Sequence, residues 1–396
     1  MRQQKRLLYF LSHPIQYISP LLTELAKESD LQVYYFSDAS IRGGKDAGFG
    51  VQVKWDVPLL EGYKSTFLPN KSKKETLDNK FWELINPAVI KVLKRETGDV
   101  IVVHGWSYAS VWMTILAGKW YGKKIWLRAE NPYNQEIKKS KRTLFLKRII
   151  LKNILFKMID KCLYIGKESK KFFEYYGVPE EKLLYTPYCV NNAFFQLKHE
   201  ELKSNRDSIK TELNLPLDKK IILYSGKYIP KKNPLDLIKA YEKIGSSNVA
   251  LVMVGEGELR KEMEAYIQQH NLSDIYLTGF INQSSIPKYY EIADVFVMCS
   301  GMEETWGLSV NEAMNFAKPV VVSDTCGCSA DLVKNGENGF VFREKNIDDL
   351  AACINKLISD EAFCISAGNK SKEIIMDYSN SAIVRNLVEG LNNSVQ

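Results

Sequence analysis

Short apolar runs alternate with amphipathic segments along the chain, and this order constrains the fold more than any other feature. In the first half, the apolar runs lie at residues 7–11, 32–36, 100–104, 124–128 and 163–165. A second series lies at residues 221–225, 249–254, 275–277, 295–298, 319–323 and 340–342. Strands that alternate with helices form parallel sheets with helices on both faces. The pattern therefore predicts an α/β protein with two doubly wound domains.

The length of 396 residues fits two such domains, each able to bury a core of its own. Residues 201–219 are rich in charge and contain the turn-like run Asn-Leu-Pro-Leu-Asp, so we expect the linker there. We predict an N-terminal domain at residues 1–200, a C-terminal domain at 220–375 and a helical segment at 376–396. The periodicity of this last segment leaves open which domain it packs on.

Cysteine usage and hydropathy indicate the compartment. No segment approaches the roughly 20 consecutive apolar residues of a spanning helix, and the first apolar run is too short for a signal peptide. The seven cysteines are odd in number, and their one close pair, Cys326 and Cys328, lacks further ligands for a metal ion. We expect a cytoplasmic protein with reduced thiols and without a metal.

The two halves of the chain differ in charge. Residues 1–200 carry 33 Lys and Arg against 20 Asp and Glu, whereas residues 201–396 carry 21 against 27. The positive half indicates an anionic partner, which is a membrane surface, an acidic substrate or nucleic acid. No nucleic-acid-binding module is recognisable, so we expect no nucleic-acid partner.

The positive charge is densest at residues 138–157, where eight cations stand without an acidic residue. The cations are Lys138, Lys139, Lys141, Arg142, Lys147, Arg148, Lys152 and Lys157. With the apolar residues between them, they fit an amphipathic helix on an anionic bilayer. They also fit an ordinary helix that packs by its apolar stripe. Both interpretations stay open, and the charge of the whole half favours the membrane.

Residues 301–314 combine several groups that suit a phosphorylated ligand. They follow the run at 295–298 and lead into an apolar helix, so a glycine-containing loop and a helix N-terminus meet at the carboxyl edge of the sheet. Backbone N–H groups at such an edge suit a diphosphate, and a carboxylate can accept hydrogen bonds from a ribose diol. Glu304 lies in this loop, and Glu312 lies one or two turns into the helix.

This segment resembles the E-x7-E motif of retaining GT-B glycosyltransferases of family 4, with Trp306 in place of the usual Phe. The later segments 319–324, 326–333 and 335–340 follow the family's order of strand, loop and glycine turn. The resemblance implies the GT-B fold, with two Rossmann-like domains facing a cleft. It also implies that Glu304 contacts the donor sugar and that Glu312 binds the nucleotide ribose.

The loop after the run at 221–225 resembles the family's G-R-x-x-x-x-K loop. Lys232 matches the family lysine, whereas Lys227 stands where arginine is usual. An ammonium group therefore replaces a guanidinium group that could form two parallel hydrogen bonds with a phosphate. Cations in this loop can neutralise the charge that builds on a departing diphosphate. The donor-binding residues that the resemblance implies are Gly226, Gly279, Phe280, Trp306, Gly307, Leu308 and Glu312.

A dinucleotide site is not expected at Gly255-Glu256-Gly257. The third glycine of the G-x-G-x-x-G motif is missing, because Arg260 occupies its place.

In the first half, candidate residues lie in loops after predicted strands. His104 ends the run at 100–104, where family 4 members often place a histidine beside the donor sugar, so we include it among the catalytic candidates. His13 and Glu130 are candidates for the acceptor side, supported by their loop positions. We expect all three to open onto the cleft.

The resemblance implies a retaining glycosyltransferase with Glu304, Lys232, Lys227 and His104 as its catalytic residues. It would use a nucleotide-sugar without metal or other cofactor. The acceptor is expected to be a lipid-linked glycan for a cell-surface polysaccharide, reached at the inner face of the plasma membrane. The alternatives are a non-catalytic GT-B nucleotide-binding subunit, a GT-B sugar epimerase and an inverting transferase.

Overall fold

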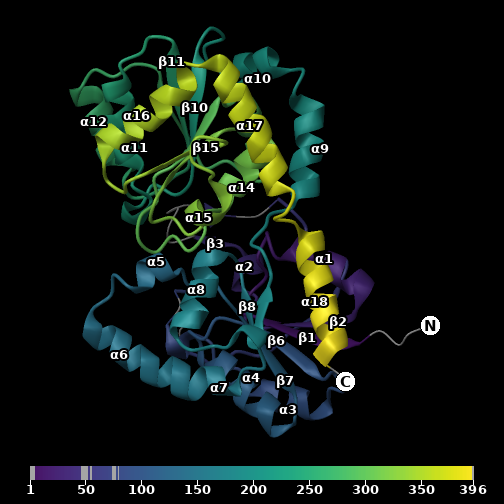
Figure 1. Ribbon diagram of the computed structural model, residues 1–396. Helices are drawn as coiled ribbons and strands as arrows, with labels where there is room; N and C mark the ends of the chain where they lie inside the picture. The colour runs from purple at the N-terminus through teal and green to yellow at the C-terminus, as the bar shows by residue number, and fades with distance from the viewer. Residues whose placement is uncertain (1–4, 46–51, 54–55, 74–76, 79, 395–396) are drawn as a thin grey trace. The chain divides into compact units, whose positions relative to one another are not determined.

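The computed structural model describes residues 5–45, 52–53, 56–73, 77–78 and 80–394. The chain forms two compact units. Unit 1 comprises Met1–Gly44, Pro58–Tyr188 and Asn380–Gln396, and unit 2 comprises Lys45–Val57 and Cys189–Ser379. In each unit, helices cover both faces of a parallel sheet (Figure 1).

Unit 1 contains a seven-stranded sheet in the order β5-β2-β1-β6-β7-β8-β9, and its paired strands are parallel. Its strands are β1 (Arg6–Leu11), β2 (Asp30–Tyr35), β5 (Lys64–Phe67), β6 (Val100–His104), β7 (Lys124–Ala129), β8 (Lys161–Tyr164) and β9 (Leu183–Tyr185). Its helices are α1 (Ser19–Glu28), α2 (Ala39–Arg42), α3 (Ala88–Arg95), α4 (Ala109–Trp120), α5 (Tyr133–Glu136), α6 (Lys141–Ile150), α7 (Phe156–Met158), α8 (Lys167–Tyr175) and α18 (Asn380–Ser394).

Unit 2 contains a six-stranded parallel sheet in the order β12-β11-β10-β13-β14-β15. Its strands are β10 (Lys220–Ser225), β11 (Val249–Val254), β12 (Ile275–Gly279), β13 (Val295–Met298), β14 (Val320–Ser323) and β15 (Gly339–Phe342). Its helices are α9 (Asn192–Leu202), α10 (Arg206–Glu212), α11 (Pro234–Ile244), α12 (Arg260–Gln269), α13 (Ile286–Ile292), α14 (Leu308–Asn315), α15 (Ser329–Leu332), α16 (Ile347–Ile358) and α17 (Glu361–Ile375). A two-stranded ladder pairs β3 (Gly44–Lys45) with β4 (Gln52–Val53).

The central strands read as continuous apolar runs because both of their faces are covered. All six residues of β11 are buried, as are the first four of β6. The fold class predicted from the alternation, two doubly wound parallel sheets, is confirmed.

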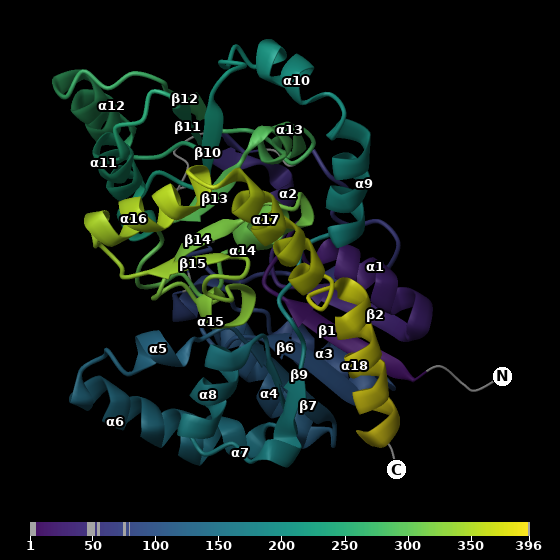
Figure 2. The ribbon, with the colours of Figure 1, turned by 45° about the horizontal axis from the view of Figure 1, so that its top comes forward.

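The C-terminal helix α18 packs within unit 1. Ile383, Leu387 and Leu391 are buried, and the side-chain amide of Asn386 donates to the carbonyl of Tyr185 at 2.9 Å. Gly390 allows close approach, since a Cβ there would lie 3.0 Å from the Trp126 ring. The helix lies beside α1 in both ribbon views (Figures 1 and 2). This placement answers the question that the periodicity left open.

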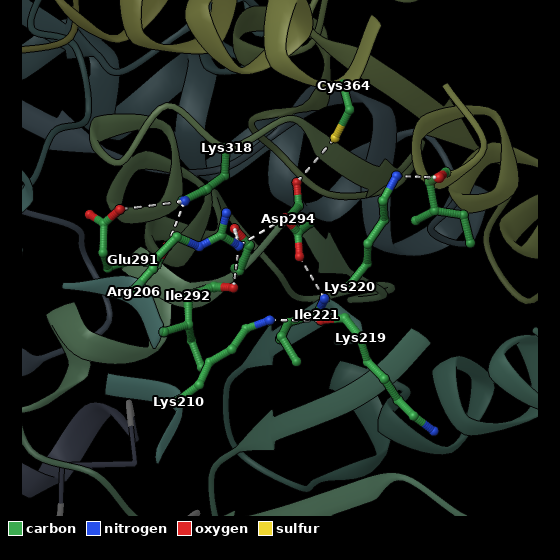
Figure 3. A network of polar contacts seen from close by, with 12 residues as sticks. Arg206, Lys210, Lys219, Lys220, Ile221, Glu291, Ile292, Asp294, Lys318 and Cys364 are labelled. Atoms are coloured by element: carbon green, nitrogen blue, oxygen red, sulfur yellow. Dashed lines mark hydrogen bonds and ion pairs between the residues drawn. The ribbon is translucent and has the colours of Figure 1, made fainter. Parts of the chain in front are cut away.

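The segment that the sequence suggested as a linker is partly helical, and it belongs to unit 2. Arg206 and Lys210 of α10 join a polar network at the amino edge of the sheet (Figure 3). Arg206 donates to Asp294 at 2.8 Å, and the other carboxylate oxygen of Asp294 accepts from the N–H of Ile221 at 2.7 Å. Lys210 donates to the carbonyl of Lys219 at 2.8 Å. The charges that resembled linker composition therefore fasten α10 to the starts of β10 and β13.

Candidate functional site

The carboxyl edge of the unit 2 sheet has a topological switch point between β10 and β13. The chain leaves β10 towards β11 on one side and leaves β13 towards β14 on the other, so the loops after these two strands diverge. Ligands of open α/β sheets bind in the crevice that such loops leave. Gly226, Lys227 and Lys232 lie in the loop after β10. Glu304 and the segment around it lie in the loop after β13, so the structure brings these predicted residues to one place.

The two loops are bonded to each other. The N–H of Gly301 donates to the carbonyl of Lys231 at 2.8 Å, and the amide of Asn233 donates to the carbonyl of Cys299 at 3.1 Å. The Lys232 ammonium forms an ion pair with the Glu304 carboxylate. These two side chains are only 16% and 13% exposed, so the pair is largely withdrawn from solvent and weakly screened. Two predicted catalytic residues 72 positions apart are therefore in contact.

The loop that carries Glu304 is braced from behind by residues 326–328. The N–H of Gly327 donates to the carbonyl of Glu304 at 3.2 Å, and the N–H of Cys328 donates to that of Trp306 at 3.0 Å. A side chain at Gly327 would collide with the carbonyl oxygen of Thr305. The loop is thus fixed before any ligand arrives, and the segment at 326–333 acts as its support.

The side chain of Trp306 is buried beneath the loop that carries Glu304. Its side chain is 2% exposed, and its indole N–H donates to the amide oxygen of Asn311 at 2.8 Å. The ring therefore packs in the interior of unit 2, and only backbone groups of Trp306 remain for a donor. The next residue, Gly307, has φ +102° at the N-cap of α14, and Leu308 begins the helix. The helix start has no side-chain cap, which leaves N–H groups of its first turn for an anion.

Glu312 is half-buried in α14, with two hydrogen-bond donors on its carboxylate. The hydroxyl of Tyr290 donates at 2.6 Å and the amide of Gln283 donates at 3.4 Å. Burial raises the pKa of Glu312 to about 7, although these two hydrogen bonds act in the opposite direction. Sequence reasoning missed Tyr290 and Gln283. Neither is close to Glu312 in sequence, and Tyr290 belongs to the apolar pattern of α13.

The turn at Gly255-Glu256-Gly257 supports the loop after β10. The N–H of Gly226 donates to the carbonyl of Val254 at 3.0 Å, and the N–H of Tyr228 donates to that of Glu256 at 2.9 Å. At Gly255, φ is +152° and an added Cβ would collide with the carbonyl of Gly226. These glycines therefore permit close packing between two loops.

Gly279 and Phe280 lie at the end of β12, next to this turn. The carbonyl of Gly279 accepts from the N–H of Gly255 at 3.0 Å, and the φ of Gly279 is +82°. Phe280 is half-buried. The hydrogen bonds thus connect the loops after β10, β11 and β12.

In unit 1, His104 lies at the carboxyl end of β6. The Tyr9 hydroxyl is 2.7 Å from His104 Nε2. Burial and the nearby Arg128 guanidinium hold the pKa of His104 well below its ordinary value, so the imidazole is neutral at physiological pH. Arg128 is itself 2% exposed, and its guanidinium lies over the Tyr188 ring at 5.3 Å. Tyr9 and Tyr188 had no sequence signal, because each belongs to a generally apolar run.

The other two candidates of unit 1 follow β1 and β7. His13 Nδ1 is 2.9 Å from the Ser12 hydroxyl, and burial lowers the pKa of His13 to about 4. Glu130 is half-buried directly after β7. The carboxyl ends of β1, β6 and β7 thus carry two neutral imidazoles and one carboxyl group, side chains that can exchange hydrogen bonds with hydroxyl groups.

Across the described ranges, no cluster of three or more His, Cys, Asp or Glu side chains is arranged to hold a metal ion. Within the same ranges, no helix has the length and hydropathy needed to cross a bilayer.

The family described as "Glycosyl transferases group 1" matches residues 205–374. The chain is 31% identical over 218 residues to an uncharacterized glycosyltransferase of Methanocaldococcus jannaschii, covering 54% of each protein. It is 29% identical over 178 residues to the UDP-Gal:alpha-D-GlcNAc-diphosphoundecaprenol alpha-1,3-galactosyltransferase of Escherichia coli, covering 43% of this chain and 45% of that protein. The chain spans about half the length of the curated relatives it matches.

Among solved structures, Anabaena Alr3699/HepE in complex with UDP and glucose has a TM-score of 0.73 at 17% identity, covering 98% of this chain and 100% of that one. At this identity the likeness concerns the fold, and the two Rossmann-like units have the GT-B fold.

Proposed function

Because the chain carries a group 1 glycosyltransferase domain on a GT-B fold, we propose that it is a retaining transferase that moves a sugar from a UDP-sugar to a lipid-linked glycan. The observation that carries this proposal is the ion pair between Lys232 and Glu304 at the switch point of unit 2. A nucleotide-sugar contains an anionic diphosphate and a sugar with hydroxyl groups. A cation at this edge can bind the diphosphate, and a carboxylate beside it can accept hydrogen bonds from the hydroxyl groups.

The ion pair implies an exchange of partners when the donor binds. The diphosphate carries more negative charge than one carboxylate, so it draws the Lys232 ammonium away from Glu304. Glu304 then accepts hydrogen bonds from the donor sugar, beside the carbon at which the bond breaks. Lys232 meanwhile stabilises the charge that grows on the departing phosphate, and Lys227 and the N-terminus of α14 assist it.

Retention is supported by the resemblance of residues 304–312 to the E-x7-E motif of retaining GT-B glycosyltransferases. In the proposed mechanism the acceptor hydroxyl attacks from the face that the diphosphate leaves, and a phosphate oxygen takes the proton of that hydroxyl. The new glycosidic bond then keeps the configuration of the old one, and no side chain becomes bonded to the sugar. In unit 1, neutral His104 and His13 would exchange hydrogen bonds with sugar hydroxyls, and Glu130 would accept from the acceptor.

We further propose that catalysis needs no metal, because lysines and backbone N–H groups supply the positive charge. Turnover is therefore expected to be unchanged by excess EDTA and by added Mg²⁺ or Mn²⁺. A rate that EDTA abolishes and Mg²⁺ restores would contradict this part of the proposal.

The donor proposal is tested by a melting experiment with UDP-, GDP- and ADP-sugars. UDP compounds are favoured because UDP is present in the Anabaena structure and UDP-Gal is in the name of the Escherichia coli relative. A ligand at a hundred times its Kd stabilises the native state by about 2.7 kcal/mol, so the UDP-sugar should raise the Tm by a few degrees. A Tm rise with GDP-sugars alone would mean that the donor contains guanine in place of uracil. If no nucleotide-sugar raised the Tm, the proposal of a nucleotide-sugar site would be refuted. With the stabilising donor, the anomeric configuration of the product tests retention.

The acceptor side of the proposal places the protein at the cytoplasmic face of an anionic membrane. The name of the Escherichia coli relative specifies a diphosphoundecaprenol-linked acceptor. The first 200 residues carry 33 cations against 20 acidic residues, which suits both an acidic acceptor and an anionic surface. All seven cysteines are thiols, as expected in a reducing compartment.

A further inference from the structure

Helix α6 is an exposed amphipathic helix of unit 1. None of its ten residues is buried. Phe145 is 65% exposed and Leu146 is 55% exposed, and one turn later Ile149 and Ile150 are 41% and 46% exposed. In both ribbon views α6 runs along the rim of unit 1 (Figures 1 and 2). The helix therefore presents large apolar side chains to solvent.

A polar contact attaches α6 to the unit. Lys147, the least exposed cation of the helix, forms an ion pair with Glu136, which is 1% exposed. The Tyr176 hydroxyl also donates to Glu136 at 2.6 Å, and the Lys147 ammonium lies 5.4 Å from the centre of the Phe172 ring. The inner side of α6 therefore consists of half-buried Leu144 and Lys147, and four large apolar side chains remain on the outer side.

The apolar stripe predicted for residues 138–157 divides into two parts. Leu151 and Leu155, in the π-helical turn Leu151–Leu155 after α6, are buried in the core of unit 1. Packing by an apolar stripe, one of the two open interpretations, accounts for this turn and for the half-buried Leu144 of α6. It does not account for the four exposed apolar residues of α6. The outward residues of α6 form two rows with a spacing of four, Phe145 with Ile149 and Leu146 with Ile150, so they share one surface.

Exposed cations precede, interrupt and follow these apolar residues in the sequence. They are Lys138, Lys139, Lys141, Arg142, Arg148, Lys152 and Lys157. Residues 137–157 contain no acidic side chain. Bulky apolar residues flanked by cations match the two layers of a bilayer interface, in which acyl chains lie beneath anionic headgroups. A second copy of the chain is a poor occupant, because two such faces would oppose like charges.

We propose that α6 lies in the interface of an anionic bilayer, with Phe145, Leu146, Ile149 and Ile150 inserted among the acyl chains and Lys147 holding unit 1 to the helix from within. This inference rests on the membrane partner of the proposed function and specifies the residues that enter the lipid. It distinguishes insertion from attraction by charge alone, because an inserted helix stays bound when salt screens the cations.

The test measures cosedimentation of the full chain with vesicles, without turnover. Vesicles of phosphatidylglycerol and phosphatidylcholine in equal parts are compared with phosphatidylcholine alone, at low and at high salt. The wild type should bind the anionic vesicles at low salt and retain part of this binding at high salt. The double variant Phe145→Ser/Ile149→Ser should bind at least about tenfold more weakly, because two exposed side chains no longer enter the acyl layer.

Matched variants separate insertion from other effects. Leu197→Ser/Ile365→Ser removes two apolar side chains of unit 2 that are 58% and 60% exposed, and it should bind like the wild type. Arg142→Glu/Arg148→Glu should lose most binding at low salt. Lys147 is left unchanged because it holds α6 in place. All variants should keep the wild-type Tm, since the replaced side chains are exposed.

Several results would overturn the inference. One is a wild type that ignores anionic vesicles at low salt, and another is a Phe145→Ser/Ile149→Ser variant that binds as well as the wild type. Self-association in solution that this variant abolishes would assign the surface to a second copy. Donor-induced melting shifts are recorded on the same samples, so a failure of lipid binding with intact donor binding would refute the inserted helix and leave the donor site standing.

Discussion

Replacing Glu304 by glutamine is expected to lower kcat by about 100-fold while the Kd of the UDP-sugar changes only a few-fold. The carboxylate is proposed to act beside the reacting carbon, so its interactions strengthen as positive charge develops on the sugar. The removal of one fixed electrostatic group from a site that excludes water commonly lowers kcat by about 10²–10³-fold. The measurement is donor turnover under saturation, together with calorimetric binding of the same donor.

Lys232→Met should show a comparable loss of kcat, because the ammonium is proposed to stabilise the departing phosphate. Lys231 offers a matched control, since it is the adjacent cation and is exposed. Lys231→Met should keep kcat within about twofold of the wild type, as expected for a surface substitution. A near-normal rate in Lys232→Met, or equal losses in both lysine variants, would remove Lys232 from the site.

The double variant Glu304→Gln/Lys232→Met adds a second criterion. The two side chains are in contact, so their effects on kcat are expected to be far from additive. If the two residues act as one unit, the double variant should be about as slow as either single variant. Independent, multiplicative losses would mean that the ion pair has no part in their action.

The sequence revealed the strands that contain a continuous apolar run, including the edge strands β12 and β15. The predicted run at 249–254 coincides with β11, and the run at 100–104 coincides with β6. Strand β5 (Lys64–Phe67) was missed because it lies at the edge of the sheet and its burial alternates, which leaves no apolar run. Strand β9 (Leu183–Tyr185) was missed because three half-buried residues are too few to make a pattern.

The docking of α10 and α18 shows a second limit of sequence reasoning. The sequence indicated a linker in place of α10 and left the partner of α18 open, because the positions of both helices depend on contacts with distant residues. Arg206 meets Asp294, 88 residues away, and Asn386 meets Tyr185, 201 residues away. Local patterns contain no information on such pairs.

The candidate site was predicted unevenly for a similar reason. Glu304, Glu312 and Lys232 belong to motifs with a fixed spacing, so they could be named and their convergence expected. Tyr290 and Tyr9 are hydrogen-bond partners of Glu312 and His104, yet each lies in an element whose sequence indicates a core. The exposed apolar face of α6 could be predicted only in part. The sequence indicates an amphipathic segment, and the structure shows which side of the helix faces solvent.

The largest effect on donor binding is expected at Glu312, and it should depend on pH. The pKa of its carboxyl group is raised by burial to about 7, so about half of the ligand-free molecules are protonated at neutral pH. A ribose diol donates hydrogen bonds and is bound by the ionised form. Donor binding should therefore lower this pKa and release a proton. Below pH 7 the affinity should fall by up to about tenfold per pH unit, and above pH 8 it should be constant.

Calorimetry with an intact UDP-sugar tests this coupling, because its diphosphate diester does not titrate near neutrality. Titrations in two buffers of different ionisation enthalpy count the protons released. Glu312→Gln should bind about ten- to a hundredfold more weakly at pH 8, since neutral acceptors form weaker hydrogen bonds, and its affinity should not vary with pH. The control Glu303→Gln, an exposed acid in the neighbouring loop, should keep both the affinity and the slope of the wild type.

Tyr290→Phe provides an independent check on the origin of the coupling. The Tyr290 hydroxyl donates to the Glu312 carboxylate at 2.6 Å and so lowers its pKa against the effect of burial. Without this donor, the pKa of Glu312 should rise further, and the pH below which affinity falls should move upward. A wild-type affinity that is flat from pH 5.5 to 8 would show that no proton is released and that Glu312 does not bind the ribose as proposed. A slope that survives in Glu312→Gln would show that another group releases the proton.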